Sequence, residues 1–346
     1  MTHKKANAFH LTKNASILTL GLFMLFGTSC HKSTTTTYLG DWMSSADFDG
    51  PSRADAVSFV IGDHAYVATG YQKDNTWLND NWSFDRGTNT WTQMANVPGA
   101  GRNSAVAFTI GTTAYVGTGY DGVNYLNDFY SYNTINNTWD TIANYTGTPR
   151  IGAVAFASAT NGFVGTGYDN GDNWKKDFYS YNPSTNTWSE APSYNGKVRT
   201  DAVAFVINNI AYVATGVNSG SYNQDMWAFD LNSNTWTQKG QIINVLDDTK
   251  DDLYTSIQRS NSTVFVMDNI AYLATGYNSG VLSSVWAYDP SADQWTQKTD
   301  LEAPAREDAV SFTINGSGFL GLGQNSSIRM GDFWEFAPTA TEVANN

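Results

Sequence analysis

Short apolar and aromatic runs alternate with turns rich in Gly, Asn and Asp along most of the chain. In one unit, a run of small and β-branched residues at 55–60 and an apolar run at 65–70 are followed by an aromatic run at 81–85 and a tryptophan segment at 90–92. These runs are short, and none has the period of an amphipathic helix. The pattern therefore predicts four short strands per unit.

The same unit recurs six times along the chain. An arginine opens each unit, and successive arginines are 49, 48, 49, 60 and 47 residues apart. The six are Arg53, Arg102, Arg150, Arg199, Arg259 and Arg306. Four strands repeated at roughly 45–50 residues are typical of the blades of a β-propeller. The sequence predicts an all-β fold: a six-bladed β-propeller of four-stranded antiparallel blades over residues 41–338.

The spacing of tryptophans also predicts how the ring closes. Trp91 stands eleven residues before Arg102, and the same interval recurs in three later units. The sixth unit ends after its aromatic run at 332–336 and has no tryptophan segment of its own. Trp42, however, stands eleven residues before Arg53. We therefore expect the N-terminal strand near Trp42 to close the last blade, which removes an open sheet edge.

These features together resemble kelch repeats of the galactose-oxidase-like propeller superfamily. The resemblance is carried by the opening arginine, the second strand ending in Thr-Gly, the aromatic third strand and the tryptophan of the fourth. One departure is that Thr-Gly replaces the Gly-Gly pair of the family in five units, and Leu322-Gly323 replaces it in the sixth. The resemblance implies a fold, whereas activity has to be argued from a site.

Residues 1–29 have the features of a secretory signal. They carry three lysines, an apolar run at 17–26 and then small residues. Cys30 follows directly, which resembles the lipobox of bacterial lipoproteins and implies a lipid on Cys30. Gly27 departs from the aliphatic residue usual there, so an ordinary signal with an incidental cysteine stays open. The expected location is the bacterial cell envelope, periplasm-facing or at the surface, with 30–40 as a polar tether and 339–346 as a tail.

Composition argues against several kinds of chemistry. The only cysteine is Cys30, and the histidines are His3, His10, His31 and His64. Zinc sites, cysteine nucleophiles and intramolecular disulfides are therefore not expected. Without the predicted signal the chain has 16 basic and 32 acidic residues, a net charge of −16. This charge argues against nucleic acid or an anionic membrane surface as a partner. Membrane contact would be through the lipid on Cys30 only.

The up-and-down order of strands predicts where a ligand binds. The first strand of each blade starts on the face where the second ends, so all six arginines are expected around one mouth of the channel. Aromatic residues of the following loops would form its rim: Tyr71, Tyr120, Tyr168, Trp77 and Trp174. Guanidinium groups bind carboxylates in pairs of hydrogen bonds, and aromatic faces stack on sugars or peptide side chains. The predicted ligand is an acidic peptide or a glycan.

A structural role for the arginines is the alternative. A second set stands two positions after them, on the strand face that the arginines would share: Asp55, Ser104, Gly152, Asp201, Asn261 and Asp308. The aspartates of this set could neutralise the arginines while the guanidiniums tie neighbouring blades through loop carbonyls. Under the ligand-binding hypothesis, alanine at Arg102, Arg150 and Arg199 removes binding without unfolding the protein.

The leading functional hypothesis is a monomeric, lipid-anchored binding or scaffold propeller that is not an enzyme. The alternative is a sugar-processing enzyme resembling sialic acid mutarotases, with Glu302, Glu307 or one of the aspartates as acid or base. No catalytic residue is assigned. Copper oxidase chemistry is not expected, because the family uses a cysteine and histidines, whereas this propeller has no cysteine and only His64, in a turn expected on the opposite face. No cofactor or metal is predicted, and the loop 169–173, which lacks the closing glutamate of a calcium loop, is predicted to be a hydrophilic turn.

Overall fold

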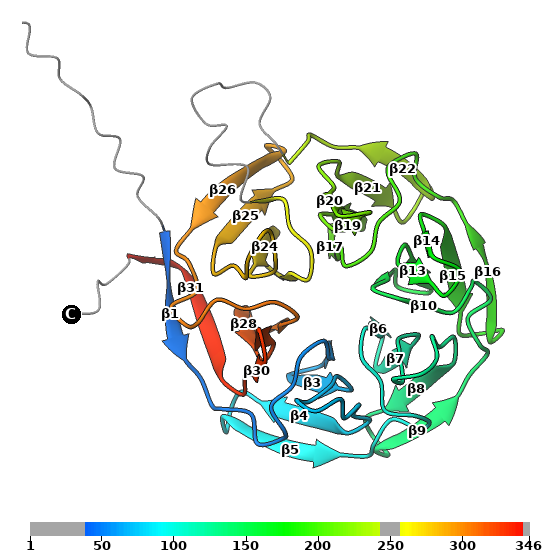
Figure 1. Ribbon diagram of the computed structural model, residues 1–346, viewed down its shortest axis with the longest axis horizontal. Coiled ribbons are helices and arrows are strands. Elements are labelled where there is room, and N and C mark those ends of the chain that lie inside the picture. Colours follow the sequence, from blue (N-terminus) through cyan, green and yellow to red (C-terminus); the bar gives the residue numbers. More distant parts are fainter. Residues whose placement is uncertain (1–38, 243–256, 342–346) are drawn as a thin grey trace, which may run out of the picture. The chain divides into compact units, whose positions relative to one another are not determined.

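Hydrogen bonding between neighbouring strands organises the described residues, 39–242 and 257–341 of this computed structural model, into six four-stranded antiparallel sheets. Figure 1 shows these sheets as blades around a central axis. No α-helix occurs in the described ranges. The prediction of an all-β propeller built from four-stranded blades is confirmed.

Each blade runs from an inner to an outer strand. The first is β2 (Val57–Ile61), β3 (His64–Ala68), β4 (Asn81–Asp85) and β5 (Thr90–Met94). The second is β6 (Val106–Ile110), β7 (Thr113–Gly117), β8 (Phe129–Asn133) and β9 (Thr138–Thr141). The third is β11 (Val154–Ala157), β12 (Gly162–Gly165), β15 (Phe178–Asn182) and β16 (Thr187–Ala191). The fourth is β17 (Val203–Ile207), β18 (Ile210–Ala214), β21 (Trp227–Asp230) and β22 (Thr235–Gln238).

The last two blades and the short hairpins complete the set. The fifth blade is β23 (Thr263–Met267), β24 (Ile270–Ala274), β25 (Val285–Asp289) and β26 (Gln294–Lys298). The sixth is β27 (Val310–Ile314), β28 (Ser317–Gly321), β31 (Phe333–Thr341) and β1 (Leu39–Ser44). Short strands are β10 (Arg150–Ile151), β13 (Tyr168–Asp169), β14 (Asn173–Trp174), β19 (Val217–Asn218), β20 (Ser221–Tyr222), β29 (Gln324–Asn325) and β30 (Ile328–Arg329).

The sixth blade is closed by the N-terminal strand, as predicted. β1 pairs antiparallel with β31, and Trp42 stands opposite Phe336 (Figure 1). Both strands extend beyond the predicted boundaries, because Leu39 pairs with Thr341. Residues 39–40 and 339–341 are therefore strand rather than tether and tail. The rest of the predicted signal and tether, including Cys30, lies outside the described residues.

The core lies between adjacent blades. Inner strands alternate, so that Phe59 of β2 is buried while Ser58 is half-buried beside the central channel. One cluster of buried side chains joins Phe108 and Phe129 of the second blade to Tyr181 and Trp188 of the third. A single sheet could not bury these rings, so the blades depend on stacking against one another.

The outer-strand tryptophans add hydrogen bonds between blades. Trp139 Nε1 donates to the carbonyl oxygen of Ala95 in the preceding blade at 2.8 Å, and Asn137 Oδ1 accepts from the Ala95 amide, also at 2.8 Å. At the closure, Trp42 Nε1 donates to Thr299 O at 3.3 Å. These side chains are therefore part of the core and also connect it to the neighbouring blade.

The Thr-Gly turns hold a β-branched residue in an unusual conformation. Five threonines lie in the left-handed region: Thr69, Thr118, Thr166, Thr215 and Thr275. Their buried hydroxyls have no hydrogen-bond partner in the described structure. A left-handed conformation costs a residue with a side chain roughly 1–2 kcal/mol. Tertiary contacts must therefore impose it, and they do so through the arginines described next.

Candidate functional site

The six arginines lie inside the blades, where each is fully buried. Arg150 shows the pattern: its Nη1 donates to Asp177 Oδ1 at 2.7 Å and to Thr166 O at 2.9 Å, and its Nη2 donates to Asp177 Oδ2 at 3.0 Å. Three further arginines pair with both oxygens of an aspartate in the same way: Arg53 with Asp80, Arg102 with Asp128 and Arg306 with Asp332. Arg199 donates to one carboxylate oxygen of Asp225 at 2.6 Å and to the Asp225 backbone carbonyl at 3.2 Å. At Arg259 the aspartate position is Ser284, whose Oγ accepts from Nη2 at 2.8 Å.

This geometry corrects the interpretation of Arg53, Arg102, Arg150, Arg199, Arg259 and Arg306 as a ligand-binding ring. Their guanidiniums turn into their own blades, and the carbonyls they hold belong to the strained turns of those blades. They do connect neighbouring blades, but through the backbone: Gly70 N donates to Arg102 O at 2.7 Å, and the five equivalent bonds are present. The side chains therefore have a structural role, as the alternative expected. The carboxylates that neutralise five of them, however, are other aspartates than the expected Asp55, Asp201 and Asp308: Asp80, Asp128, Asp177, Asp225 and Asp332.

The physical reason is a local reversal of the backbone. Asp55 has a φ of +55°, and the five equivalent residues have φ between +52° and +58°. Alternation of side chains with a period of two applies only to extended strand. Arg53 and Asp55 therefore do not share a face: the arginine points into the blade and the aspartate points towards the axis.

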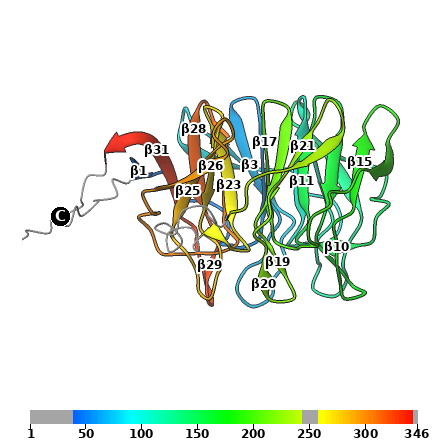
Figure 2. The ribbon, with the colours of Figure 1, turned by 90° about the horizontal axis from the view of Figure 1, so that it is seen from above.

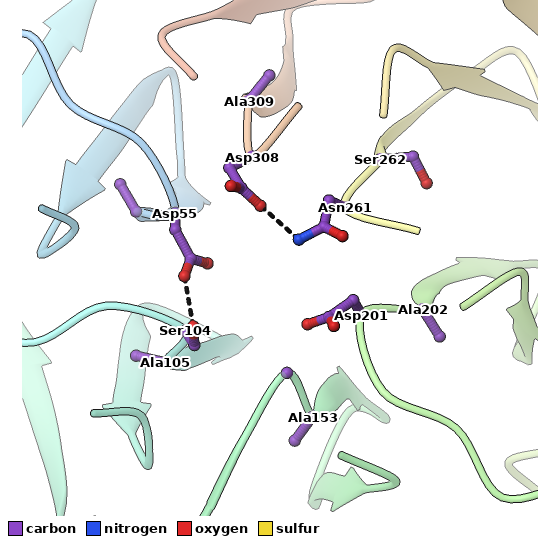
Figure 3. A pocket seen from close by; sticks show the side chains of 12 residues that line it. Asp55, Ser104, Ala105, Ala153, Asp201, Ala202, Asn261, Ser262, Asp308 and Ala309 are labelled. Carbon is purple, nitrogen blue, oxygen red and sulfur yellow. Dashed lines mark hydrogen bonds between the residues drawn. The ribbon is translucent and has the colours of Figure 1, made fainter. Parts of the chain in front are cut away.

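Six residues surround the axis, and we call them the axial belt. They are Asp55, Ser104, Gly152, Asp201, Asn261 and Asp308. Asp55 N donates to Asp308 O at 3.0 Å and Asp308 N to Asn261 O at 2.9 Å, and the series continues from Asn261 to Asp201 and from Asp201 to Gly152. Figure 3 shows the side chains of Asp201 and Asp308 directed towards the centre and that of Asp55 turned towards Ser104. The belt residues surround a pocket of about 130 Å³.

Asp55 is a carboxyl group held in a poorly solvated position. It accepts a hydrogen bond from Ser104 Oγ (Figure 3). It accepts a second from Asn103 Nδ2 at 2.8 Å. Burial, followed by the nearby charge of Asp308, raises its pKa well above the usual value. Part of the belt therefore carries protons at pH values where free aspartate is ionised.

The other side of the belt has the same character. Asp308 Oδ1 accepts from Asn261 Nδ2 and its Oδ2 accepts from Gln324 Nε2, both at 2.7 Å, and burial raises its pKa. Burial and the charge of Asp308 raise the pKa of Asp201 to about 7, and the same two causes raise that of Glu307 to about 7. The centre of the mouth is thus acidic and amide-lined, the opposite of the cationic ring that the sequence suggested.

Small hairpins surround the belt, and we call the surface that carries them the mouth face (Figure 2). Each hairpin pairs two residues across its strands: Tyr71 with Trp77, Tyr120 with Tyr125, Tyr168 with Trp174, Val217 with Tyr222, Tyr277 with Val281, and Gln324 with Arg329. The predicted rim aromatics therefore do lie around the mouth. Both members of a pair are aromatic only in the first three blades.

Five of these rings form a continuous series, the aromatic arc. The centroids are 5.8 Å apart for Trp77 and Tyr120, 5.6 Å for Tyr120 and Tyr125, 6.5 Å for Tyr125 and Tyr168, and 4.9 Å for Tyr168 and Trp174. All five side chains are half-buried. They pack on one another and still present part of each ring at the surface.

The sixth blade contributes residues that the sequence analysis missed. The Arg329 guanidinium lies 4.4 Å from the centre of the Tyr71 ring, and Tyr71 Oη donates to Gln324 Oε1 at 3.1 Å. Gln324 also reaches Asp308 of the belt. The signal available was positional, because Gln324 follows Gly323 where four other blades have tyrosine. Glu302 does not line the axial pocket.

The acidic loop 169–173 is a hairpin turn closed by its own contacts. Asp169 Oδ1 accepts from Gly171 N at 3.0 Å and from Asn173 N at 3.2 Å, and Lys175 Nζ lies 2.5 Å from Asp169 Oδ2. Burial alone would raise the pKa of Asp169, but Lys175 and these bonds lower it to about 2. The Asp169 carboxylate is thus held by contacts within its own loop and by Lys175.

Residues 39–242 and 257–341 contain neither a membrane-spanning helix nor a metal-binding cluster. No helix there combines the length and hydropathy needed to cross a membrane. No three His, Cys, Asp or Glu side chains in these ranges converge as a metal site would require.

The raised pKa of Asp201 predicts a pH dependence of stability. Between about pH 4 and 7 the folded protein holds a proton that the unfolded chain has lost, so unfolding becomes easier as the pH rises through this window. Asp201→Asn removes this effect. Relative to wild type, we expect the variant to gain roughly 2–4 kcal/mol of unfolding free energy between pH 4 and pH 8. Urea titrations at both values measure the difference. The control is Asp74→Asn, at an exposed position, whose unfolding free energy should change with pH as that of wild type does. If Asp201→Asn also shows the same change between pH 4 and pH 8 as wild type, the raised pKa of Asp201 is wrong.

Comparison with known proteins agrees with the architecture. The model described as the KLHDC2/KLHL20/DRC7 Kelch-repeats domain matches residues 147–297, and the Kelch motif model matches residues 52–98. A solved structure titled "Structure of YjhT" superposes with a TM-score of 0.71 at 16% identity, covering 84% of this chain and 95% of that one. At this identity the likeness concerns the fold alone. No curated protein matches the sequence.

Proposed function

Since the chain is a kelch-repeat β-propeller, we propose that its mouth face binds an uncharged carbohydrate. The observation that carries the proposal is the axial belt, whose carboxyl, amide and hydroxyl groups surround a small pocket beside a series of aromatic rings. Sugars are bound by such polar groups acting on hydroxyls, together with aromatic surfaces against C–H faces.

An acidic peptide, the other ligand suggested by the sequence, is less well supported. The guanidiniums that would have held its carboxylates are buried and engaged. Asp55, Asp201 and Asp308 line the axial pocket instead. Those that are ionised repel an anion, and those that are protonated offer it no positive charge. Each belt carboxyl can accept a hydrogen bond from a hydroxyl group, and when protonated it can also donate one.

Calorimetric titration with a panel of neutral oligosaccharides tests the proposal. We expect saturable binding by the wild type and a loss of roughly tenfold to hundredfold in affinity for Asp201→Ala, because one hydrogen bond to a carboxyl group is removed. The matched control is Asp63→Ala, an exposed aspartate on the far face, which should bind like wild type. Absence of binding to every sugar, or equal loss in both variants, would count against a carbohydrate site at the belt.

Acid–base chemistry on a sugar is the second candidate. It is favoured by the pKa values of about 7 for Asp201 and Glu307, which suit proton transfer near neutral pH. Anomer interconversion, the reaction of the mutarotases that the sequence resembles, needs such groups. With the wild-type protein added, proton NMR of a freshly dissolved neutral reducing sugar should show its two anomers interconverting faster than the spontaneous rate. The Asp201→Asn variant should accelerate the interconversion less. If the sugar's anomers exchange at the spontaneous rate in the presence of the protein, the acid–base hypothesis is wrong and only the binding function remains.

A further inference from the structure

The axial pocket is too small to hold a whole sugar unit. Its volume is about 130 Å³, slightly less than the roughly 150 Å³ cavity that accommodates one benzene molecule. A hexose ring with its hydroxyl groups is larger than benzene. A sugar at the belt therefore extends beyond the belt residues. Towards the channel it would meet a region of about 280 Å³ lined only by alanine, valine, serine and threonine, whereas the mouth face offers aromatic rings. The rest of the sugar is therefore expected to lie on the mouth face.

The surrounding surface is not the same in all directions. The aromatic arc occupies the first three blades, where neighbouring ring centroids are 4.9–6.5 Å apart. The fourth and fifth blades each replace one ring of the pair by valine, Val217 and Val281. The sixth has Gln324 and Arg329 instead. An uninterrupted series of stacking surfaces therefore extends from the belt only over the first three blades, whereas the fourth and fifth blades each offer a single ring.

The arc begins at the belt itself. Trp77 Nε1 donates to Asn103 Oδ1 at 2.9 Å, and Asn103 Nδ2 donates to Asp55 Oδ2 at 2.8 Å. Trp77, at one end of the arc, is thus held by the same amide that holds a belt carboxyl. At the other end Trp174 packs on Tyr168 in the third blade. The polar centre and the aromatic rim therefore form one continuous surface.

We propose that the ligand is an extended neutral oligosaccharide whose terminal unit meets the belt and whose following units lie along the aromatic arc. The proposal rests on the carbohydrate-binding function proposed above and adds chain length and direction to it. Each further unit gains contact with another ring until Trp174 is reached. Affinity then stops increasing, because no further stacking surface follows along that path.

The test is calorimetric titration with homologous neutral oligosaccharides of one to six units, namely the cello-, xylo-, manno- and malto- series. We expect one series to bind with affinity that rises with length and then levels off. Trp174→Ala should weaken the longest member by about tenfold while changing binding of the monosaccharide or disaccharide little. Tyr125→Ala, in the middle of the arc, should act on shorter members as well.

The control is Tyr277→Ala, which removes an exposed ring of the fifth blade, outside the arc. It should leave the length dependence unchanged, and thermal melts should show all three variants folded. Sugar binding that is lost in Asp201→Ala yet independent of chain length and of Trp174 would overturn this inference and leave the proposed function standing. If none of the four series binds at any length, both fail together.

Discussion

Replacing Arg150 with alanine is expected to destabilise the protein by about 3 kcal/mol, because it removes a fully buried guanidinium that is paired with Asp177. The loss is at the low end for a broken buried ion pair, since the Asp177 side chain is 37% exposed and water can solvate its carboxylate. The guanidinium also donates to Thr166 O at 2.9 Å and to Thr148 O at 3.0 Å, and it lies 5.0 Å from the centre of the Tyr145 ring. All of these contacts are lost together. Urea unfolding followed by tryptophan fluorescence measures the change.

Arg86→Ala is the matched control for Arg150→Ala. Arg86 is also paired with a carboxylate, Glu335, at 2.7 Å, but its side chain is 39% exposed. An exposed pair contributes about 1 kcal/mol or less. The structural assignment of the buried arginines fails if Arg150→Ala unfolds like wild type. A variant that stays folded but no longer binds a ligand would restore the ligand-binding ring predicted from the sequence.

Trp42→Ala is expected to cost about 3–5 kcal/mol of unfolding free energy, as for other buried aromatic residues. Trp42 is 4% exposed, and its ring centroid lies 4.7 Å from that of Phe336 and 6.3 Å from that of Phe265. The substitution removes these contacts and the hydrogen bond to Thr299 O. Because β1 closes the ring, the substitution weakens the pairing between the first and last described strands, β1 and β31.

The adjacent residue supplies the control for the closure. Met43 points to the other side of β1 and is 48% exposed. Met43→Ala should change the unfolding free energy by no more than about 0.5 kcal/mol. Thermal melts by circular dichroism compare the two variants. Equal melting temperatures for Trp42→Ala and wild type would mean that the N-terminal strand does not stabilise the sixth blade.

The repeat and its closure could be derived from the chain because both are recorded in spacing. Four short runs between turns give the blade, and the eleven-residue interval from Trp42 to Arg53 indicates the strand that closes the ring. These features are local or periodic. Strand formation and the burial of alternate residues follow from the order of apolar and polar side chains alone.

The mouth was only partly derivable. The positions of Tyr71, Trp77 and the other rim aromatics follow from the order of strands. The contacts of Gln324 and Arg329, by contrast, join blades that are remote in sequence, and no repeat marks them. The belt residues can be recognised in the sequence as a set, because each stands two positions after an arginine. Their role, however, depends on the direction in which the neighbouring arginines point.

The sequence by itself thus determined the number of repeated units, the four strands in each and the segment that completes the last blade. Only the tertiary structure decided the sign of φ at Asp55 and its equivalents, and with it the destination of the arginines. That sign is fixed by backbone hydrogen bonds between blades, such as Gly70 N to Arg102 O and Asp55 N to Asp308 O, which exist only once the ring has assembled. Residue order cannot encode them locally, so the guanidiniums became core and the carboxyl groups became the mouth.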